Sequence, residues 1–291
     1  MKFALLGHPV AHSLSPVIHR AAYRELGLEH SYGLIDAASE ADVERALAAL
    51  QAGELAGLNV TVPWKRYAFA RCARSSALAE RLGVANVLGA SQGELVGHNT
   101  DALALEVEFA RAASGNALVL GSGGATPAVV AACQSAGLSQ VLVTARRFTP
   151  ATPRVDWPGA SELERLGAQL LEWPLVGGEA RERFEAALVE VGLLVQSTSA
   201  GMHGAEPGQP LAELVPWELL PPDALAYDLI YAPLETPFLR AARHAGLRTA
   251  HGLNMLVGQA ALAIEIWLGR RPPNEPLLAA ALAELAARGS P

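Results

Sequence analysis

The sequence predicts an α/β protein, because short apolar runs alternate with helical patterns from one end of the chain to the other. Its 291 residues fit two domains or one large one, since a domain usually holds about 100–200 residues. Hydrophobic residues make up 51% of the chain, which is enough to build cores and too many for a disordered protein. We therefore expect folded α/β domains built on a mainly parallel sheet.

The first hundred residues contain five apolar runs of strand length and three stretches with helical periodicity. The expected strands are residues 3–6, 32–35, 58–62, 84–88 and 94–96, and the expected helices are residues 16–26, 41–51 and 65–82. A Ser-Gln-Gly sequence between the last two strands is typical of a tight turn. This order predicts βαβ units in an N-terminal α/β domain.

A longer helix, near residues 102–113, is expected to open a second α/β domain. The strands expected after it are 117–120, 141–144, 169–172, 192–196 and 224–229, and the helices are 126–136, 161–167, 179–190 and 236–245. Two proline-rich stretches, 148–160 and 207–222, are expected to be loops. Neither has a function that we can derive from its residues.

Two Ala- and Leu-rich helices, near 254–268 and 276–287, close the chain without strands of their own. Helices without a sheet need another apolar surface, so we expect them to return to the first domain. The predicted domains are therefore residues 1–103 with 252–291, and residues 104–251.

Charge and composition exclude several classes of protein. The 29 acidic residues exceed the 22 basic ones, so the basic footprint of a nucleic-acid-binding protein is missing. The apolar run at the N-terminus meets Gly7 and Pro9 too soon for a signal peptide, and no stretch approaches the roughly 18–20 apolar residues of a membrane span. Cys72 and Cys133 lie far apart, which argues against a metal or redox pair. We expect a soluble, cytoplasmic protein without a metal and without a nucleic-acid or membrane partner.

Only two of the 22 basic residues, Lys2 and Lys65, are lysines. Lys65 follows a strand end on which Asn59 and Thr61 share one face, and it stands at the start of a predicted helix, where the helix dipole favours anions. Arginine cannot replace lysine where a compact amine must release a proton. Codon bias and a solvated side chain would also explain a lone lysine, so this residue needs a second line of evidence.

A glycine-rich turn separates the strand 117–120 from the helix that begins at Thr126. Such turns let backbone N–H groups approach a pyrophosphate at a helix N-terminus. The turn consists of Gly121, Ser122, Gly123, Gly124 and Ala125. The strand context predicts a dinucleotide site, although a generic βα turn remains an alternative.

The end of the next strand favours NADP over NAD. An NAD enzyme usually has an acidic residue there for the ribose hydroxyls, whereas this chain has Arg146 and Arg147. Guanidinium groups suit a 2′-phosphate, and Arg154 could add to them. A solvated basic pair is the alternative explanation.

Further polar residues stand at strand ends and helix starts. Ser15 precedes Pro16 and is expected to cap a helix, while Ser13 beside it could help to hold a small carboxylate. Asp101 or the preceding threonine is expected to cap the next long helix. Asn86 lies within an apolar strand and Gln259 within an apolar helix, where each is either a tolerated polar residue or a ligand group.

Taken in order, these clusters resemble the shikimate dehydrogenase family. The matching motifs are Ser-x-Ser-Pro at 13–16, Asn-Val-Thr-x-Pro-x-Lys at 59–65, Asn86, Asn-Thr-Asp at 99–101, the glycine-rich turn at 121–125, Ser-Thr-Ser-Ala-Gly-Met at 197–202, the segment 228–236, and Gly252, Met255 and Gln259 near the end. Each motif is modest alone, but the ordered set spans nearly the whole chain.

The resemblance implies reversible, NADP-dependent reduction of 3-dehydroshikimate to shikimate, on a discontinuous substrate domain and a Rossmann domain with a cleft between them. By this resemblance Lys65 and Asp101 form the catalytic pair, and Ser13 and Ser15 bind the substrate carboxylate. The implied ligands of the ring hydroxyls are Asn59, Thr61, Asn86 and Gln259, with Tyr231 nearby. The implied cofactor contacts are the turn 121–125, Arg146, Arg147, Thr198, Gly252 and Met255.

Four positions depart from the family pattern. Val87 stands where threonine is usual, Ala145 where asparagine is usual, and Gln196 and Arg20 where asparagine is frequent. The change at 145 leaves NADP selectivity to Arg146 and Arg147. A quinate/shikimate dehydrogenase, or a paralog acting on another cyclic polyol acid, remains an alternative, as does a non-catalytic NADP-binding sensor. The sequence leaves a monomer and a homodimer equally open.

Overall fold

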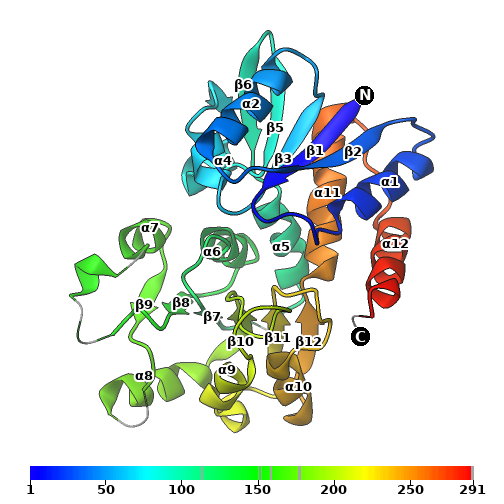
Figure 1. Ribbon diagram of the computed structural model, residues 1–291. Helices are drawn as coiled ribbons and strands as arrows, with labels where there is room; N and C mark the ends of the chain where they lie inside the picture. The colour runs from blue at the N-terminus through cyan, green and yellow to red at the C-terminus, as the bar shows by residue number, and fades with distance from the viewer. Residues whose placement is uncertain (113, 150, 152, 158, 176–177, 290–291) are drawn as a thin grey trace. The chain divides into compact units, whose positions relative to one another are not determined.

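The computed structural model describes residues 1–289 except 113, 150, 152, 158, 176 and 177. The chain divides into two compact units, which we call unit 1 (residues 1–104 and 256–289) and unit 2 (residues 105–255). Each unit contains one six-stranded sheet flanked by helices, as Figure 1 shows. The predicted two-domain α/β class is therefore confirmed.

Unit 1 is built on a mixed sheet with the strand order β2-β1-β3-β5-β6-β4. The strands are β1 (Lys2–Gly7), β2 (Ser31–Asp36), β3 (Gly57–Val60), β4 (Arg74–Ser75), β5 (Val87–Ser91) and β6 (Glu94–His98). β5 runs antiparallel to both β3 and β6, whereas the other neighbouring pairs are parallel. Gln92 and Gly93 join β5 to β6 with positive φ angles, as the tight turns of hairpins require.

The helices of unit 1 cover both faces of this sheet. They are α1 (Ser15–Glu25), α2 (Glu40–Gln51), α3 (Lys65–Phe69), α4 (Ala77–Leu82), α11 (Leu253–Leu268) and α12 (Asn274–Ala287), with α5 (Asp101–Phe109) starting at the end of the unit. Alternate residues of β1 point to opposite faces: Leu6 packs in a core with Leu47 of α2, while Phe3 stacks on Trp267 of α11 at 4.9 Å between ring centres.

Unit 2 is built on a wholly parallel sheet with the strand order β12-β11-β10-β7-β8-β9. The strands are β7 (Asn116–Leu120), β8 (Val141–Thr144), β9 (Gln169–Leu171), β10 (Val191–Gln196), β11 (Leu225–Asp228) and β12 (Arg248–His251). Counted within the unit, this is the order 3-2-1-4-5-6 of a Rossmann sheet, in which ligands bind where the order reverses, here between β7 and β10.

The helices of unit 2 are α6 (Thr126–Ser135), α7 (Ala160–Arg165), α8 (Glu179–Leu188), α9 (Gln209–Leu214) and α10 (Pro237–His244). Phe184 of α8 and Phe238 of α10 are buried in one core with Leu118 and Leu194 of the central strands. Every residue of β7, β8 and β10 is buried, as expected for central parallel strands with both faces covered.

Several elements differ from the prediction. The expected helix 65–82 is divided into α3, β4 and α4, because Ser76 caps a new helix by accepting a hydrogen bond from Ala79 N and because β4 pairs with β6. The expected loop 207–222 contains α9, and the strand β12 was missed. The expected loop 148–160 contains a short 3₁₀ helix at Arg154–Asp156, and its residues 150, 152 and 158 lie outside the described part of the chain.

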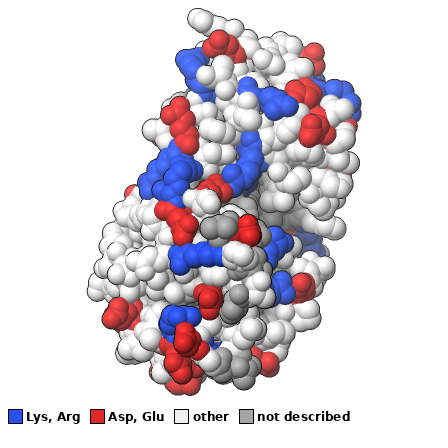
Figure 2. Space-filling view, turned by 90° about the vertical axis from the view of Figure 1, so that its left-hand side faces the viewer, with Lys and Arg blue, Asp and Glu red and all other residues white. Residues whose placement is uncertain are grey.

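The described residues contain no helix that is both long and apolar enough to cross a bilayer. On the face shown in Figure 2, basic and acidic side chains are interspersed. Many charged residues of the chain form local ion pairs, such as Arg71 with Glu44 and Arg243 with Glu235.

Candidate active site

The centre of the candidate site is an ion pair between Lys65 and Asp101, whose Nζ and Oδ2 atoms lie 2.6 Å apart. Lys65 begins α3 and Asp101 begins α5, and their side chains are 20% and 11% exposed. A carboxylate at a helix N-terminus is stabilised by the helix dipole. Thr100, one of the two expected caps, directly precedes α5 and its carbonyl accepts from Ala104 N, whereas the side-chain bond to the first turn comes from Asn99, whose Oδ1 accepts from Ala102 N.

Asn86 ties Asp101 to the edge of the sheet. Its Nδ2 donates to Asp101 Oδ1 at 2.8 Å and to Thr100 Oγ1 at 3.0 Å, and its Oδ1 accepts from Thr100 N at 2.7 Å. Each oxygen of the Asp101 carboxylate thus has its own partner, Lys65 on one side and Asn86 on the other. Both amide hydrogens of Asn86 are therefore in use, and its Oδ1 also lies 3.4 Å from Thr100 Oγ1, which donates to it.

Sheet pairing explains why these residues meet. Asn59 in β3 lies opposite Val87 in β5, and Val87 lies opposite His98 in β6. The ladder continues past the strand ends, because Val60 N donates to Asn86 O and Asn86 N donates to His98 O. The residues that follow β3 and β6 and precede β5 therefore share one edge of the sheet.

Asn59 and Thr61 were expected on one face of the β3 end. Asn59 is buried, and its amide donates to Asn86 O at 3.4 Å and accepts from Tyr32 Oη at 2.7 Å. Thr61 is half-buried and its backbone N donates to Leu6 O. A Cβ at Gly7 would overlap the Thr61 side chain, so glycine permits this close approach.

Ser13 and Ser15 lie at the N-terminus of α1. Ser13 Oγ accepts from Ser15 N at 3.2 Å, and the two hydroxyls are 3.1 Å apart. The expectation that Ser15 is the cap was wrong, because α1 begins at Ser15 and the preceding cap position is Leu14, which supplies no capping side chain. Ser13 Oγ donates to Ser15 Oγ, and a pair of adjacent hydroxyls at a helix N-terminus suits an anionic group.

Beneath Ser15 and Asn59 lies a buried aromatic layer that sequence reasoning missed. His19, one turn after Ser15 on α1, stacks on Tyr32 with ring centres 3.8 Å apart. Burial lowers the pKa of His19 to about 3, although the neighbouring Asn59 side chain acts to raise this pKa. The Nε2 atom of His19 makes no hydrogen bond within the described residues. Burial also raises the pKa of Tyr32 well above its usual value. No local signal in the sequence marks either residue as part of a site.

In unit 2, the glycine-rich turn lies where the strand order reverses. Gly121 has φ +121°, and a Cβ there would lie 2.8 Å from Ser197 Oγ and from Thr198 Cγ2, which follow β10. Thr126, which stands where the dinucleotide motif has Gly or Ala, is buried and bonds the Gly121 carbonyl and the Ser197 hydroxyl, each at 3.1 Å. The turns after β7 and β10 therefore close on each other beside the N-terminus of α6. Gly124 faces open space.

Arg146 and Arg147 follow β8 and are exposed. Arg146 Nη1 forms an ion pair with Glu206 Oε2 at 2.6 Å, so an acidic residue does lie near this strand end, although it comes from a distant loop. Arg154 bonds Glu164 through Nε and Nη2, at 3.1 and 2.8 Å, and is therefore engaged locally.

The remaining predicted residues fall in different units. Tyr231, Gly252 and Met255 belong to unit 2, together with Thr198, whereas Gln259 belongs to unit 1. Asp228 closes the turn that carries Tyr231 by accepting from Thr236 Oγ1 and Ile230 N, and burial raises the pKa of its carboxyl to about 7. Gln259 is buried and donates to Leu256 O, which leaves its Oε1 as an acceptor.

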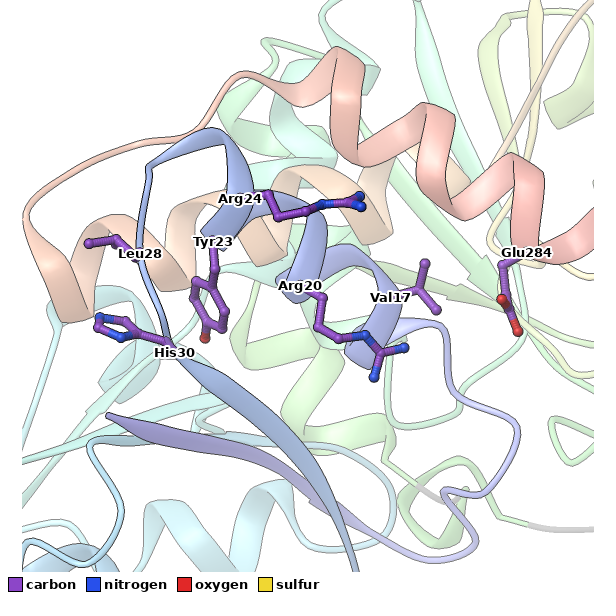
Figure 3. A pocket seen from close by; sticks show the side chains of 7 residues that line it. All are labelled: Val17, Arg20, Tyr23, Arg24, Leu28, His30 and Glu284. Carbon is purple, nitrogen blue, oxygen red and sulfur yellow. The ribbon is translucent and has the colours of Figure 1, made fainter.

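Neither a metal site nor a pocket elsewhere in the described residues competes with this candidate site. No group of three or more His, Cys, Asp or Glu side chains there could hold a metal ion. A hollow of about 410 Å³ on unit 1, lined in part by Arg20, Arg24 and His30, contains none of the predicted site residues (Figure 3).

Two family models match the chain. Residues 5–88 match the shikimate dehydrogenase substrate binding domain, and residues 252–282 match the shikimate 5′-dehydrogenase C-terminal domain. A curated relative from Symbiobacterium thermophilum, named shikimate dehydrogenase (NADP(+)), is 39% identical over 97% of this chain and 93% of its own. A relative of the same name from Mesorhizobium japonicum is 38% identical over 93% of this chain and 91% of its own.

Solved structures agree with these matches. The shikimate 5-dehydrogenase of Thermus thermophilus, in complex with NADP(H) and shikimate, has a TM-score of 0.79 and 36% identity, covering 97% of this chain and 99% of that one. The 5-ketofructose reductase of a Gluconobacter species has a TM-score of 0.79 at 23% identity, with 98% of each chain covered, and shows a common fold alone.

The pH dependence of stability tests the buried state of His19. The folded chain keeps His19 neutral down to a pKa of about 3, whereas the unfolded residue titrates near 6.5. As the pH falls, the unfolded state therefore binds a proton at His19 before the folded state does. The contribution of neutral His19 to the free energy of unfolding is complete above about pH 6.5 and is lost as the pH falls toward 3. Between pH 7.5 and 5, the wild type should lose about 2 kcal/mol of unfolding free energy relative to His19→Phe, measured by urea denaturation. Equal pH profiles for the two proteins would contradict the assignment.

Proposed function

Since the chain belongs to the shikimate dehydrogenase family, we propose that it catalyses the reversible, NADP-dependent reduction of 3-dehydroshikimate to shikimate, a step of aromatic amino-acid biosynthesis. The observation that carries this proposal is the ion pair between Lys65 and Asp101, which is held by Asn86 at the edge of the unit 1 sheet. Unit 1 would bind the substrate, and unit 2 would bind the dinucleotide.

The residues of unit 2 fit an NADP molecule. The turn 121–125 and the N-terminus of α6 offer backbone N–H groups for a pyrophosphate, and a side chain at Gly121 would overlap Ser197 and Thr198 of the neighbouring turn. Arg146 and Arg147 would bind the 2′-phosphate through charge-assisted hydrogen bonds. Thr198, Gly252 and Met255 would border the remainder of the cofactor.

When bound, NADPH supplies a hydride to the C3 carbonyl carbon of 3-dehydroshikimate, so the carbonyl oxygen must gain a proton. Lys65 would donate that proton from Nζ and stabilise the negative charge that develops on the oxygen. Asp101 would orient Nζ through their 2.6 Å contact. In the oxidation of shikimate, Lys65 would accept the proton from the hydroxyl.

Substrate recognition would come from the polar groups around this pair. Ser13 and Ser15 would bind the carboxylate, and Asn59, Thr61 and Gln259 would bind ring hydroxyls, with Tyr231 nearby. Asn86 would also contact a ring hydroxyl of the substrate while it orients Asp101. We further propose a cytoplasmic enzyme, active as a monomer or homodimer, without a nucleic-acid or membrane partner.

The proposed activity is tested by measuring NADP reduction with shikimate and, separately, with quinate. Rapid turnover of shikimate with slow turnover of quinate is the expected result. Comparable turnover of both would favour a quinate/shikimate dehydrogenase. NADP binding without turnover of either compound would favour a cofactor sensor and refute the proposal.

Replacing Lys65 tests its proposed role as proton donor. Lys65→Met should lower kcat by at least about 100-fold with little change in KM, because general acid catalysis typically contributes about 10²–10⁴-fold. Lys65→Arg should be similarly impaired, since guanidinium supplies charge but does not readily release a proton. Lys2→Met, which changes the other lysine, is the control and should retain full activity. A Lys65→Arg variant with near-normal kcat would exclude the role.

Replacing Arg146 tests the basis of cofactor choice. Arg146→Ala should raise KM for NADP by about tenfold or more and leave KM for NAD nearly unchanged, because only NADP carries the 2′-phosphate. Arg154→Ala is the matched control, because Arg154 is likewise an exposed arginine paired with a glutamate but does not follow β8. If Arg146→Ala weakens both cofactors equally, Arg146 does not select between them.

A further inference from the structure

The side chain of Asn59 is held between two fixed partners, both of which lie in unit 1. Its Nδ2 lies 3.4 Å from the backbone carbonyl oxygen of Asn86, and its Oδ1 lies 2.7 Å from Tyr32 Oη. Asn59 and Tyr32 are 4% and 6% exposed. Solvent therefore competes little for these two hydrogen bonds, and each constrains the orientation of the amide.

The two partners select one orientation of this amide. A backbone carbonyl can only accept, so the group that faces Asn86 O must be the NH₂ of Asn59. Oδ1 then faces Tyr32, whose hydroxyl must donate to it. Rotating the amide by 180° would place two acceptors against each other at Asn86 and lose this hydrogen bond.

Tyr32 is in turn fixed in its role as donor. Burial raises the pKa of its hydroxyl well above the usual value, so the proton stays in place at any working pH. Its ring stacks on that of His19 at an interplanar angle of 15°, and its backbone pairs with Phe3 in the sheet. Since burial lowers the pKa of His19, that ring stays neutral and places no charge beside the Tyr32 ring.

We propose that Tyr32 is a positioning residue, which fixes the amide of Asn59 so that its remaining hydrogen-bonding capacity meets a ring hydroxyl of the substrate. The inference rests on the proposed function, because it takes Asn59 as a substrate ligand. One hydrogen of Nδ2 and one lone pair of Oδ1 are left by the two fixed bonds. Tyr32 itself would not touch the substrate.

Tyr23 provides a matched control in the same aromatic layer. It is also buried, and its hydroxyl lies 3.5 Å from His19 Nδ1, whereas no hydrogen bond to Asn59 is found for it among the described residues. Tyr23 borders the hollow that is also lined by Arg20 and His30, as Figure 3 shows. Removing its hydroxyl therefore tests the loss of a buried hydroxyl without the loss of the bond to Asn59.

The experiment compares steady-state kinetics of shikimate oxidation for the wild type, Tyr32→Phe, Tyr23→Phe, Asn59→Ala and the double variant Tyr32→Phe/Asn59→Ala. Tyr32→Phe should raise KM for shikimate about five- to tenfold with kcat within about twofold, because the loss affects ground state and transition state alike. KM for NADP should stay unchanged. Tyr23→Phe should keep wild-type kinetics, and the melting temperatures of the two phenylalanine variants should be similar.

The double variant separates positioning from a general structural role. If Tyr32 acts through Asn59, adding Tyr32→Phe to Asn59→Ala should change KM no further. Additive effects, or equal effects of Tyr32→Phe and Tyr23→Phe, would overturn the inference and leave the proposed function intact. A wild type that does not oxidise shikimate would instead overturn the proposed function and this inference with it.

Discussion

The carboxylate of Asp101 connects Lys65 to the polar network of unit 1, because one of its oxygens accepts from Lys65 and the other accepts from Asn86. Without it, a lysine amine that is four-fifths buried would lack its partner, which is costly in a protein interior. Asn86 extends the network to Asn59 through its backbone carbonyl, and Asn59 extends it to Tyr32. A network in which each member is satisfied is rigid, and a rigid network can hold a proton donor at a fixed point.

The sheet supplies this rigidity. β3, β5 and β6 are neighbours, and the ladder between them runs on to Asn86 beyond the end of β5. The antiparallel direction of β5 matters, since it brings the start of β5 to the same edge as the ends of β3 and β6. Short connections at that edge then lead into α3 and α5, whose first residues are Lys65 and Asp101. Unit 2 uses the corresponding property of a parallel sheet, because the turns after β7 and β10 meet where the strand order reverses.

Local sequence patterns were sufficient for much of the fold and for several components of the site. Apolar runs located most strands, and the glycine-rich turn predicted its strand and helix neighbours, because these features depend on residues close together in the chain. The division of 65–82 into α3, β4 and α4 was missed because pairing of β4 with β6 competes with helix propensity there. The antiparallel pairing of β5 with β3 could not be derived from local patterns, because strand polarity follows from how distant segments pair.

The sequence by itself determined the α/β class and the family resemblance, and it singled out Lys65, Asp101 and the turn 121–125 as candidate site residues. Only the tertiary structure decided what holds them. Tyr32 is 27 residues from Asn59, and Glu206 meets Arg146 from a distant loop, so neither contact leaves a local pattern in the chain. The structure also assigned both amide hydrogens of Asn86 to Thr100 and Asp101. The physical reason is that hydrogen bonds are short and directional, so their partners are known only once sheet register has brought the groups within reach.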